Sequence, residues 1–92
     1  MFTLDDFDGR IGDTFTATVA GGPTRTLTLT QADAYEGSRT RFSLVFSDTV
    51  PDYVEQQIVA FEHPELGSFE LFVVPIGPGL GGGMRYEAII NT

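Results

Sequence analysis

Two runs of alternating apolar residues, over residues 68–75 and 84–91, limit most strongly what this chain can fold into. Alternation with a period of two is typical of strands, because successive side chains point to opposite faces of a sheet. The turn sequence His63-Pro64-Glu65-Leu66-Gly67 precedes the first run, and a glycine-rich segment joins the two runs. The pattern predicts a β-hairpin, which indicates a β fold class and carries no reactive group of its own.

The first half of the chain shows the same strand pattern. Apolar residues and threonines alternate over residues 14–19 and again over residues 26–30, on either side of Gly21-Gly22-Pro23, which predicts a second hairpin. A third strand is expected around residues 42–46, after a polar loop over residues 33–40. A fourth is expected over residues 58–62, after a connection over residues 48–55. Six strands at short, regular spacing are typical of a small antiparallel barrel or sandwich.

A short helix is expected near the N-terminus. Thr3 suits the N-cap position, and Asp6 stands at the third helical position to complete a capping box. Phe2 and Phe7 occupy the two positions of a hydrophobic staple. One of the next two glycines then ends the helix.

The length of 92 residues, without a linker or repeat, predicts one domain over residues 1–92. A domain of this size has room for one hydrophobic core. The predicted fold class is therefore mainly β, a single small antiparallel six-stranded barrel or sandwich with a short N-terminal helix.

The charge balance argues against several classes of partner. Thirteen Asp and Glu stand against five basic residues, all of them Arg, and the net charge is −8. Such a chain repels nucleic-acid phosphates and anionic lipid headgroups, so we expect neither nucleic acid nor a membrane as a partner. An acidic surface without lysine is typical of life in high salt and equally of a GC-rich genome that writes Arg instead of Lys, and both explanations stay open.

The chain has no cysteine, so disulfides and thiolate chemistry are excluded, and the redox state of its compartment cannot be read. Acidic residues follow Met1 where a secretory signal needs basic ones. No apolar run approaches the roughly 20 residues of a membrane span. We expect a cytoplasmic protein, free or incorporated into an assembly.

No pattern of side chains predicts a metal site or a catalytic centre. Zinc needs three or four His or Cys ligands, and the chain has one His and no Cys. Asp6, Asp8 and Asp13 gather carboxylates near a glycine, but Arg10 stands where EF-hand spacing needs an oxygen ligand, and helix capping already accounts for these acids. His63 lies in a proline turn without a nucleophile elbow, so we expect it to cap local backbone groups. No cofactor is expected.

Two further features have a plain structural interpretation. The glycine-rich segment 77–83 lacks the Gly-Lys-Ser/Thr ending of a phosphate-binding loop and is predicted to be a flexible hairpin tip. Glu70 and Glu87 have the parity to share one face of the last hairpin, as a pair of catalytic carboxylates would. Arg85 shares that face, so a surface ion-pair cluster is the better interpretation.

Both faces of the last hairpin are largely apolar, and a single core explains only one of them. One face carries Phe69, Leu71, Val73, Tyr86, Ala88 and Ile90. The other carries apolar residues among charged ones: Phe72, Val74 and Ile89 among Glu70, Arg85 and Glu87. One core takes only one face, so the second must be covered by the N-terminal helix, with Phe2, Leu4 and Phe7, or by another protein chain. The predicted partner-binding residues are Phe72, Val74, Arg85, Glu87 and Ile89.

Several motifs resemble a bacterial family of uncharacterised small domains. They are the opening Phe2-Thr3-Leu4-Asp5-Asp6-Phe7, then His63-Pro64-Glu65-Leu66-Gly67, Glu70-Leu71-Phe72, Val74-Pro75, Gly77-Pro78 and Gly83-Met84-Arg85-Tyr86-Glu87-Ala88. The resemblance spans nearly the whole chain and brings no assigned activity. It implies occurrence near phage-tail-collar-like proteins and so favours a role in assembly. The chain departs from the family after Gly77, where members are usually shorter and more acidic, so no role of that loop is carried over.

These observations favour a non-enzymatic protein–protein interaction or structural module that docks to other protein chains. The setting is a phage-tail-like or surface assembly, or a homo-oligomer. The alternative is a small-molecule-binding β-barrel with an apolar ligand in its mouth. Large side chains at predicted core positions argue against such a cavity: Phe15, Phe42, Phe46, Phe61, Phe69 and Tyr86. An enzyme comes third, because no constellation of residues supports one.

Overall fold

The computed structural model describes residues 2–19, 22, 24–50, 55–79 and 81–91. One short helix is followed by six strands. They are α1 (Asp5–Asp8), β1 (Thr14–Val19), β2 (Thr24–Ala34), β3 (Arg41–Ser47), β4 (Gln57–His63), β5 (Gly67–Pro78) and β6 (Met84–Asn91). The predicted mainly β class with a short N-terminal helix is confirmed.

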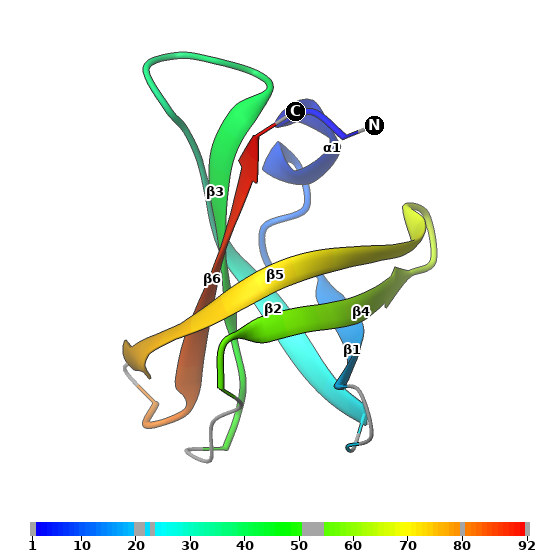
Figure 1. The fold of residues 1–92 in the computed structure, drawn as a ribbon, viewed down its shortest axis with the longest axis vertical. Coiled ribbons are helices and arrows are strands. Elements are labelled where there is room, and N and C mark those ends of the chain that lie inside the picture. Colours follow the sequence, from blue (N-terminus) through cyan, green and yellow to red (C-terminus); the bar gives the residue numbers. More distant parts are fainter. Residues whose placement is uncertain (1, 20–21, 23, 51–54, 80, 92) are drawn as a thin grey trace.

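The strands form a closed antiparallel barrel in the order β1-β2-β3-β6-β5-β4, and β1 pairs with β4 to close the ring. Of the two predicted architectures, the barrel is therefore the correct one. Figure 1 shows β4 and β5 crossing in front of β1 and β2, as the tilted strands of a small barrel do. Closure removes the exposed sheet edges through which another strand could add to the sheet.

Two irregular positions accompany this closure. The register shifts between Leu29 and Gln31 in β2, and between Pro75 and Gly77 in β5. An extra residue of this kind bends a strand and increases its twist. Each long strand can then pair with one neighbour along its first part and another along its second. Residues 24–28 of β2 pair with β1 and residues 28–34 with β3, while β5 passes from β4 to β6 at Val73.

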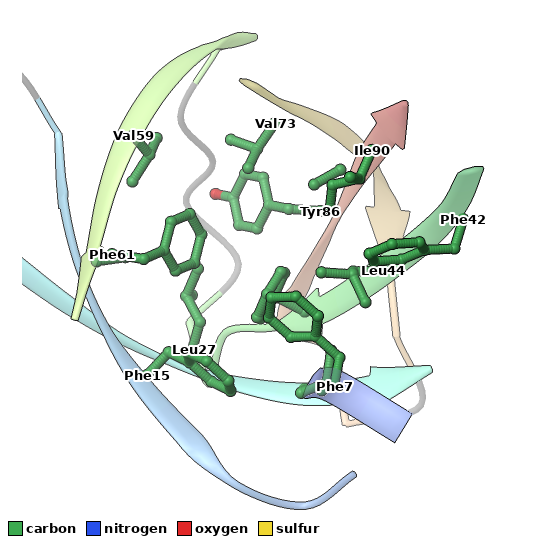
Figure 2. Packing of buried hydrophobic residues seen from close by; sticks show 14 residues of the cluster. Phe7, Phe15, Leu27, Phe42, Leu44, Val59, Phe61, Val73, Tyr86 and Ile90 are labelled. Carbon is green, nitrogen blue, oxygen red and sulfur yellow. The ribbon is translucent and has the colours of Figure 1, made fainter. Parts of the chain in front are cut away.

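Alternate residues of the strands fill the interior with large side chains (Figure 2). The ring centroids of Phe15 and Phe46 lie 5.4 Å apart, and those of Phe46 and Phe61 lie 4.9 Å apart. The predicted core aromatics are confirmed, since all but the partly buried Phe69 are at most 2% exposed: Phe15, Phe42, Phe46, Phe61 and Tyr86.

The helix α1 lies at one end of the barrel, the upper end in Figure 1. Its Phe7 is fully buried, with its ring centroid 5.9 Å from that of Phe42. The contact predicted for the hydrophobic staple is confirmed, since the ring centroids of Phe2 and Phe7 lie 5.3 Å apart. Because Phe7 packs inside the barrel, the helix does not cover the outer face of the last hairpin. That predicted alternative is wrong.

The predicted N-cap at Thr3 is also wrong. The N-cap residue is Leu4, and its side chain cannot accept a hydrogen bond. One half of the predicted capping box does form, since the backbone N–H of Thr3 donates to Oδ2 of Asp6 at 2.9 Å. Gly9 is the C-cap residue, one of the two glycines predicted to end the helix.

The turns agree with the sequence in most places. Gly67 has φ of +80°, as predicted for the end of the proline turn, where a side chain would be strained. The predicted loop over residues 33–40 begins too early, because β2 continues to Ala34, which pairs with Phe42. β5 likewise continues to Pro78, so the glycine-rich connection is shorter than predicted. Residues 21 and 23 of the first predicted turn and residues 51–54 of the predicted connection lie outside the described residues.

Candidate functional site

The outer face of the last hairpin presents the predicted partner-binding residues. Their outward direction follows from alternation, since the odd-numbered Val73 and the even-numbered Tyr86 point inward and are buried. Phe72 is 52% exposed and Ile89 is 58% exposed. Val74, Arg85 and Glu87 are partly buried. All five side chains therefore lie on the outer side of the barrel, on β5 and β6.

The strand register brings four of these five residues together. Val74 of β5 pairs with Glu87 of β6, and Val73 pairs with Ala88. Phe72 and Ile89 are the next residues along the two strands after the pair of Val73 and Ala88. Arg85 is separate, because it pairs with Gly77 and with Ser47 beyond the bulge of β5. The structure thus divides the predicted set into an apolar group with Glu87 beside it and a separate arginine.

Sequence reasoning missed one member of this apolar group. Ile58 of β4 pairs directly with Phe72 and is 58% exposed. Alternation along β4 could have identified Ile58. Phe61 points inward, and Ile58 lies an odd number of residues before it, so its side chain points outward. We call Ile58, Phe72, Val74 and Ile89 the Phe72 face.

The predicted ion-pair cluster of Arg85 with Glu70 and Glu87 is wrong. Among the described residues no salt bridge joins Arg85 to a carboxylate. The register explains this, because Glu70 pairs with Ala60 on β4 while Arg85 lies beside Gly77 beyond the bulge of β5. Other arginines do form ion pairs: Arg10 with Glu65, Arg25 with Asp48 and Arg39 with Asp5.

His63 is the centre of a second polar group. Its side chain is 4% exposed, and Nε2 lies 2.9 Å from Oδ2 of Asp13. On the other side of the ring, Nδ1 accepts hydrogen bonds from the backbone N–H groups of Glu65 at 3.1 Å and Leu66 at 3.3 Å. The predicted capping role of His63 is confirmed by these two bonds.

Asp13, His63 and Glu65 place one possible metal-ligand atom each within 4.8 Å of the others. The hydrogen bonds oppose metal binding, however. Since Nδ1 accepts from two N–H groups, the ring proton must be on Nε2, where it is donated to Asp13. A metal at Nε2 would need that proton moved to Nδ1, against two backbone donors. The Oε1 atom of Glu65 is also held by Arg10 at 2.8 Å.

The same bonds leave His63 unsuited to general-base catalysis. A general base needs a ring nitrogen within reach of a substrate, and both nitrogens of His63 are already bonded within the protein. Two of the three aspartates that could have suggested a calcium site have other roles. Asp6 accepts from Thr3, and Asp13 accepts from His63.

The space among the inward side chains of β1, β2, β4, β5 and β6 is very small. The space bounded by Ala17, Leu27, Val59 and Tyr86 measures about 10 Å³. That is about the volume one water centre occupies, whereas sites for small organic ligands span roughly 300–1,000 Å³. Figure 2 shows why, since Phe61 and Tyr86 both project into this part of the interior.

Comparisons with known proteins give one match. A family model described as Domain of unknown function (DUF6916) matches residues 2–90. Neither the curated proteins nor the solved structures searched contain a match to the chain. In the described part of the chain, no helix is long and apolar enough to cross a membrane.

Proposed function

The chain belongs to the DUF6916 family of domains of unknown function, and because membership assigns no activity, we propose that this protein is a non-enzymatic docking module. It binds another protein chain through the Phe72 face on β4, β5 and β6. A place in a bacterial phage-tail-like or surface assembly is the specific form of this proposal, and it is supported by the sequence resemblance alone.

The single observation that carries the proposal is a row of exposed apolar side chains across three strands. Ile58, Phe72 and Ile89 are each more than half exposed, at 58%, 52% and 58%. Ile58 and Phe72 are paired across β4 and β5, so their side chains are neighbours. Exposed apolar residues scattered singly need no explanation, but adjacent ones mark interaction sites.

The charges around this row define the partner. Glu70 lies two residues before Phe72, on the same outer face of β5. Glu87 of β6 pairs with Val74. A partner with apolar anchors surrounded by Lys or Arg complements such a face. A second copy of this chain fits poorly, because each copy carries a net charge of −8 and would bring acids against acids.

A small hollow at the edge of the face can take an anchoring side chain. It measures about 190 Å³ and is lined by Tyr35, Arg41, Ile89, Ile90 and Asn91. Tyr35 is 39% exposed. Tyrosine and arginine are among the residue types that contribute most to binding energy at interfaces.

The test uses a photo-crosslinking amino acid at position 72 and, as a matched control, at position 26. Thr26 is an exposed residue on β2, away from the Phe72 face. In cells of the source organism, position 72 should crosslink one protein that position 26 does not. That protein is then purified, and its dissociation constant is measured for the wild type, Phe72→Glu and Thr26→Glu.

Phe72→Glu should weaken binding about 30-fold or more, since it removes a central apolar anchor, while Thr26→Glu should leave it unchanged. Both variants should keep the melting temperature of the wild type, because neither side chain is in the core. The proposal fails if positions 26 and 72 give the same crosslinks, or if Phe72→Glu binds the partner as tightly as the wild type.

A further inference from the structure

Arg85 lies apart from the Phe72 face and has an unusual environment. It is partly buried on β6, beside Ser47 of β3 and Gly77 of β5. Its Nε atom is buried and has no hydrogen-bond partner among the described residues. The nearest acid on the same face of β6, Glu87, forms no ion pair with it. A buried donor without a partner is rare in folded proteins and calls for an explanation.

Next to Arg85 the surface is hollowed. A cavity of about 640 Å³, open to solvent, is lined by Arg85, Thr30, Gln31, Ser47, Gly79 and Gly81, among others. A second hollow of about 400 Å³ shares Ser47, Gly79 and Gly81 with it. The first volume alone is within the range of sites that hold small organic molecules. We call this first cavity the Arg85 pocket.

The glycine-rich connection holds the arginine in place. A Cβ atom built on Gly79 would lie 3.3 Å from Cγ and from Cδ of Arg85, so the backbone of the connection lies directly on the arginine stem. The connection is itself tied by hydrogen bonds from the N–H of Gly79 to the carbonyl of Gly83 and from the N–H of Gly82 to the carbonyl of Gly79. An arginine whose stem is fixed loses less conformational entropy when its guanidinium binds a ligand.

The other polar groups of the pocket suit a hydroxylated ligand. The Ser47 hydroxyl and the Gln31 amide can each donate and accept. Thr30 lies at the bulge of β2, and its hydroxyl donates to the carbonyl of Val45 at 3.1 Å, which leaves its oxygen as an acceptor. The neighbouring Asp48 is already paired with Arg25 at 2.8 Å. Among the described residues Arg85 thus has no paired carboxylate, although the protein is strongly acidic.

We propose that the Arg85 pocket binds a small organic carboxylate that carries hydroxyl groups, such as a sugar acid. The guanidinium of Arg85 pairs with the carboxylate in a two-point contact, which arginine geometry favours. The side chains of Ser47, Gln31 and Thr30 bond the hydroxyl groups. A single arginine in a chain of net charge −8 favours a monoanion over a phosphate dianion. This site is independent of the proposed docking of a protein partner.

The test is an NMR titration with glucuronate at constant ionic strength, with glucose as the neutral counterpart and inorganic phosphate as the competing anion. Glucuronate should shift the amide signals of Ser47, Gly79 and Gly81 in a saturable way, and glucose should not. Arg85→Gln should weaken glucuronate binding about tenfold or more, because it replaces the charged guanidinium by an uncharged amide. Arg39→Gln, which removes an exposed arginine that lies outside both the Arg85 pocket and the Phe72 face, should have no effect.

A second variant keeps the test decisive if Arg85→Gln does not fold. Gln31 is exposed, so Gln31→Glu should weaken glucuronate binding by charge repulsion without changing the core, whereas Thr26→Glu should not. The proposal is overturned if the glucuronate shifts do not saturate, or if Arg39→Gln weakens binding as much as Arg85→Gln. Tighter binding of phosphate than of glucuronate would also overturn the assignment of a carboxylate.

Discussion

Nε2 of His63 donates a hydrogen bond to Oδ2 of Asp13 at 2.9 Å, and so joins two positions 50 residues apart in the chain. Asp13 comes just before β1, and His63 ends β4, the two strands that close the barrel. The imidazole also packs on Phe15, with ring centroids 4.6 Å apart. Through these contacts His63 links β1 and β4, the two strands that close the barrel, to the turn that follows β4.

The first prediction concerns this contact. Asp13→Ala should lower the free energy of unfolding by about 1–3 kcal/mol, because it leaves the N–H of a buried imidazole without an acceptor. Asp13→Asn is the matched control and should cost less, since its amide oxygen can still accept. Urea denaturation measures both. Equal losses for the two variants would contradict the assigned hydrogen bond.

A second prediction follows from the bonds to both ring nitrogens. Nitrogen NMR at neutral pH should show His63 with its proton on Nε2, and addition of zinc should leave the melting temperature unchanged. Metal binding would have to displace the proton from Nε2 and the Arg10 contact from Glu65. A rise in melting temperature with zinc that disappears in Asp13→Ala would show that the three side chains hold a metal after all.

Two glycines of the same connection should respond in opposite ways to substitution. A Cβ atom on the buried Gly83 would overlap the carbonyl oxygen of Asp48, whereas none of the described atoms lies within 4 Å of a Cβ atom on Gly81. Gly83→Ala should destabilise the protein by about 1–3 kcal/mol or more, as overpacking does. Gly81→Ala should be neutral or slightly stabilising. Thermal unfolding followed by circular dichroism compares the two, and similar melting temperatures would contradict the packing of Gly83.

A fourth prediction concerns helix α1. The sequence suggests that Thr3 matters most for its stability, whereas the structure assigns this role to Asp6. Thr3→Ala should leave the free energy of unfolding nearly unchanged, because the described contacts include no hydrogen bond of the Thr3 hydroxyl. Asp6→Ala should lower the free energy of unfolding by about 0.5–2 kcal/mol, because the hydrogen bond from the N–H of Thr3 is lost. Chemical denaturation of both variants measures the difference. A larger loss for Thr3→Ala would restore Thr3 as the cap.

The last prediction concerns the depth of the core. Leu44 on β3 is fully buried, and Leu44→Ala should cost about 2–5 kcal/mol. Leu71 on β5 points toward the same core but is only partly buried, so Leu71→Ala should cost less. Equilibrium unfolding in urea gives both values. If the two losses are equal, Leu71 is buried more deeply than its exposure indicates.

Sequence alone predicted the strands and their inward faces, because both depend on local properties. Alternation marked which side chains of the last hairpin point inward, and Pro64 with Gly67 marked the turn before it. The aromatic residues of the core were recognisable by their size and parity. The hydrophobic staple of Phe2 and Phe7 was also readable, since its two positions are five residues apart in the chain.

Beyond the two predicted hairpins, sequence could not predict which strands are neighbours or where the register shifts. The pairing of β1 with β4 and the bulges after Leu29 and Pro75 arise when the sheet closes on itself, and alternation carries no signal for either. For the same reason, the pairing of Ile58 with Phe72 was not visible from the chain.

The tertiary structure also decided which charges meet. Glu70, Glu87 and Arg85 have the same parity along the last hairpin, which suggested an ion-pair cluster. Parity gives the direction of a side chain but not its neighbours on other strands. The register of β6 with β5 and β3 places Arg85 beside Gly77 and Ser47, away from Glu70, and the closed barrel brings Asp13 to His63. Local periodicity thus determined which residues are inside and outside, while contacts between distant segments depended on barrel closure.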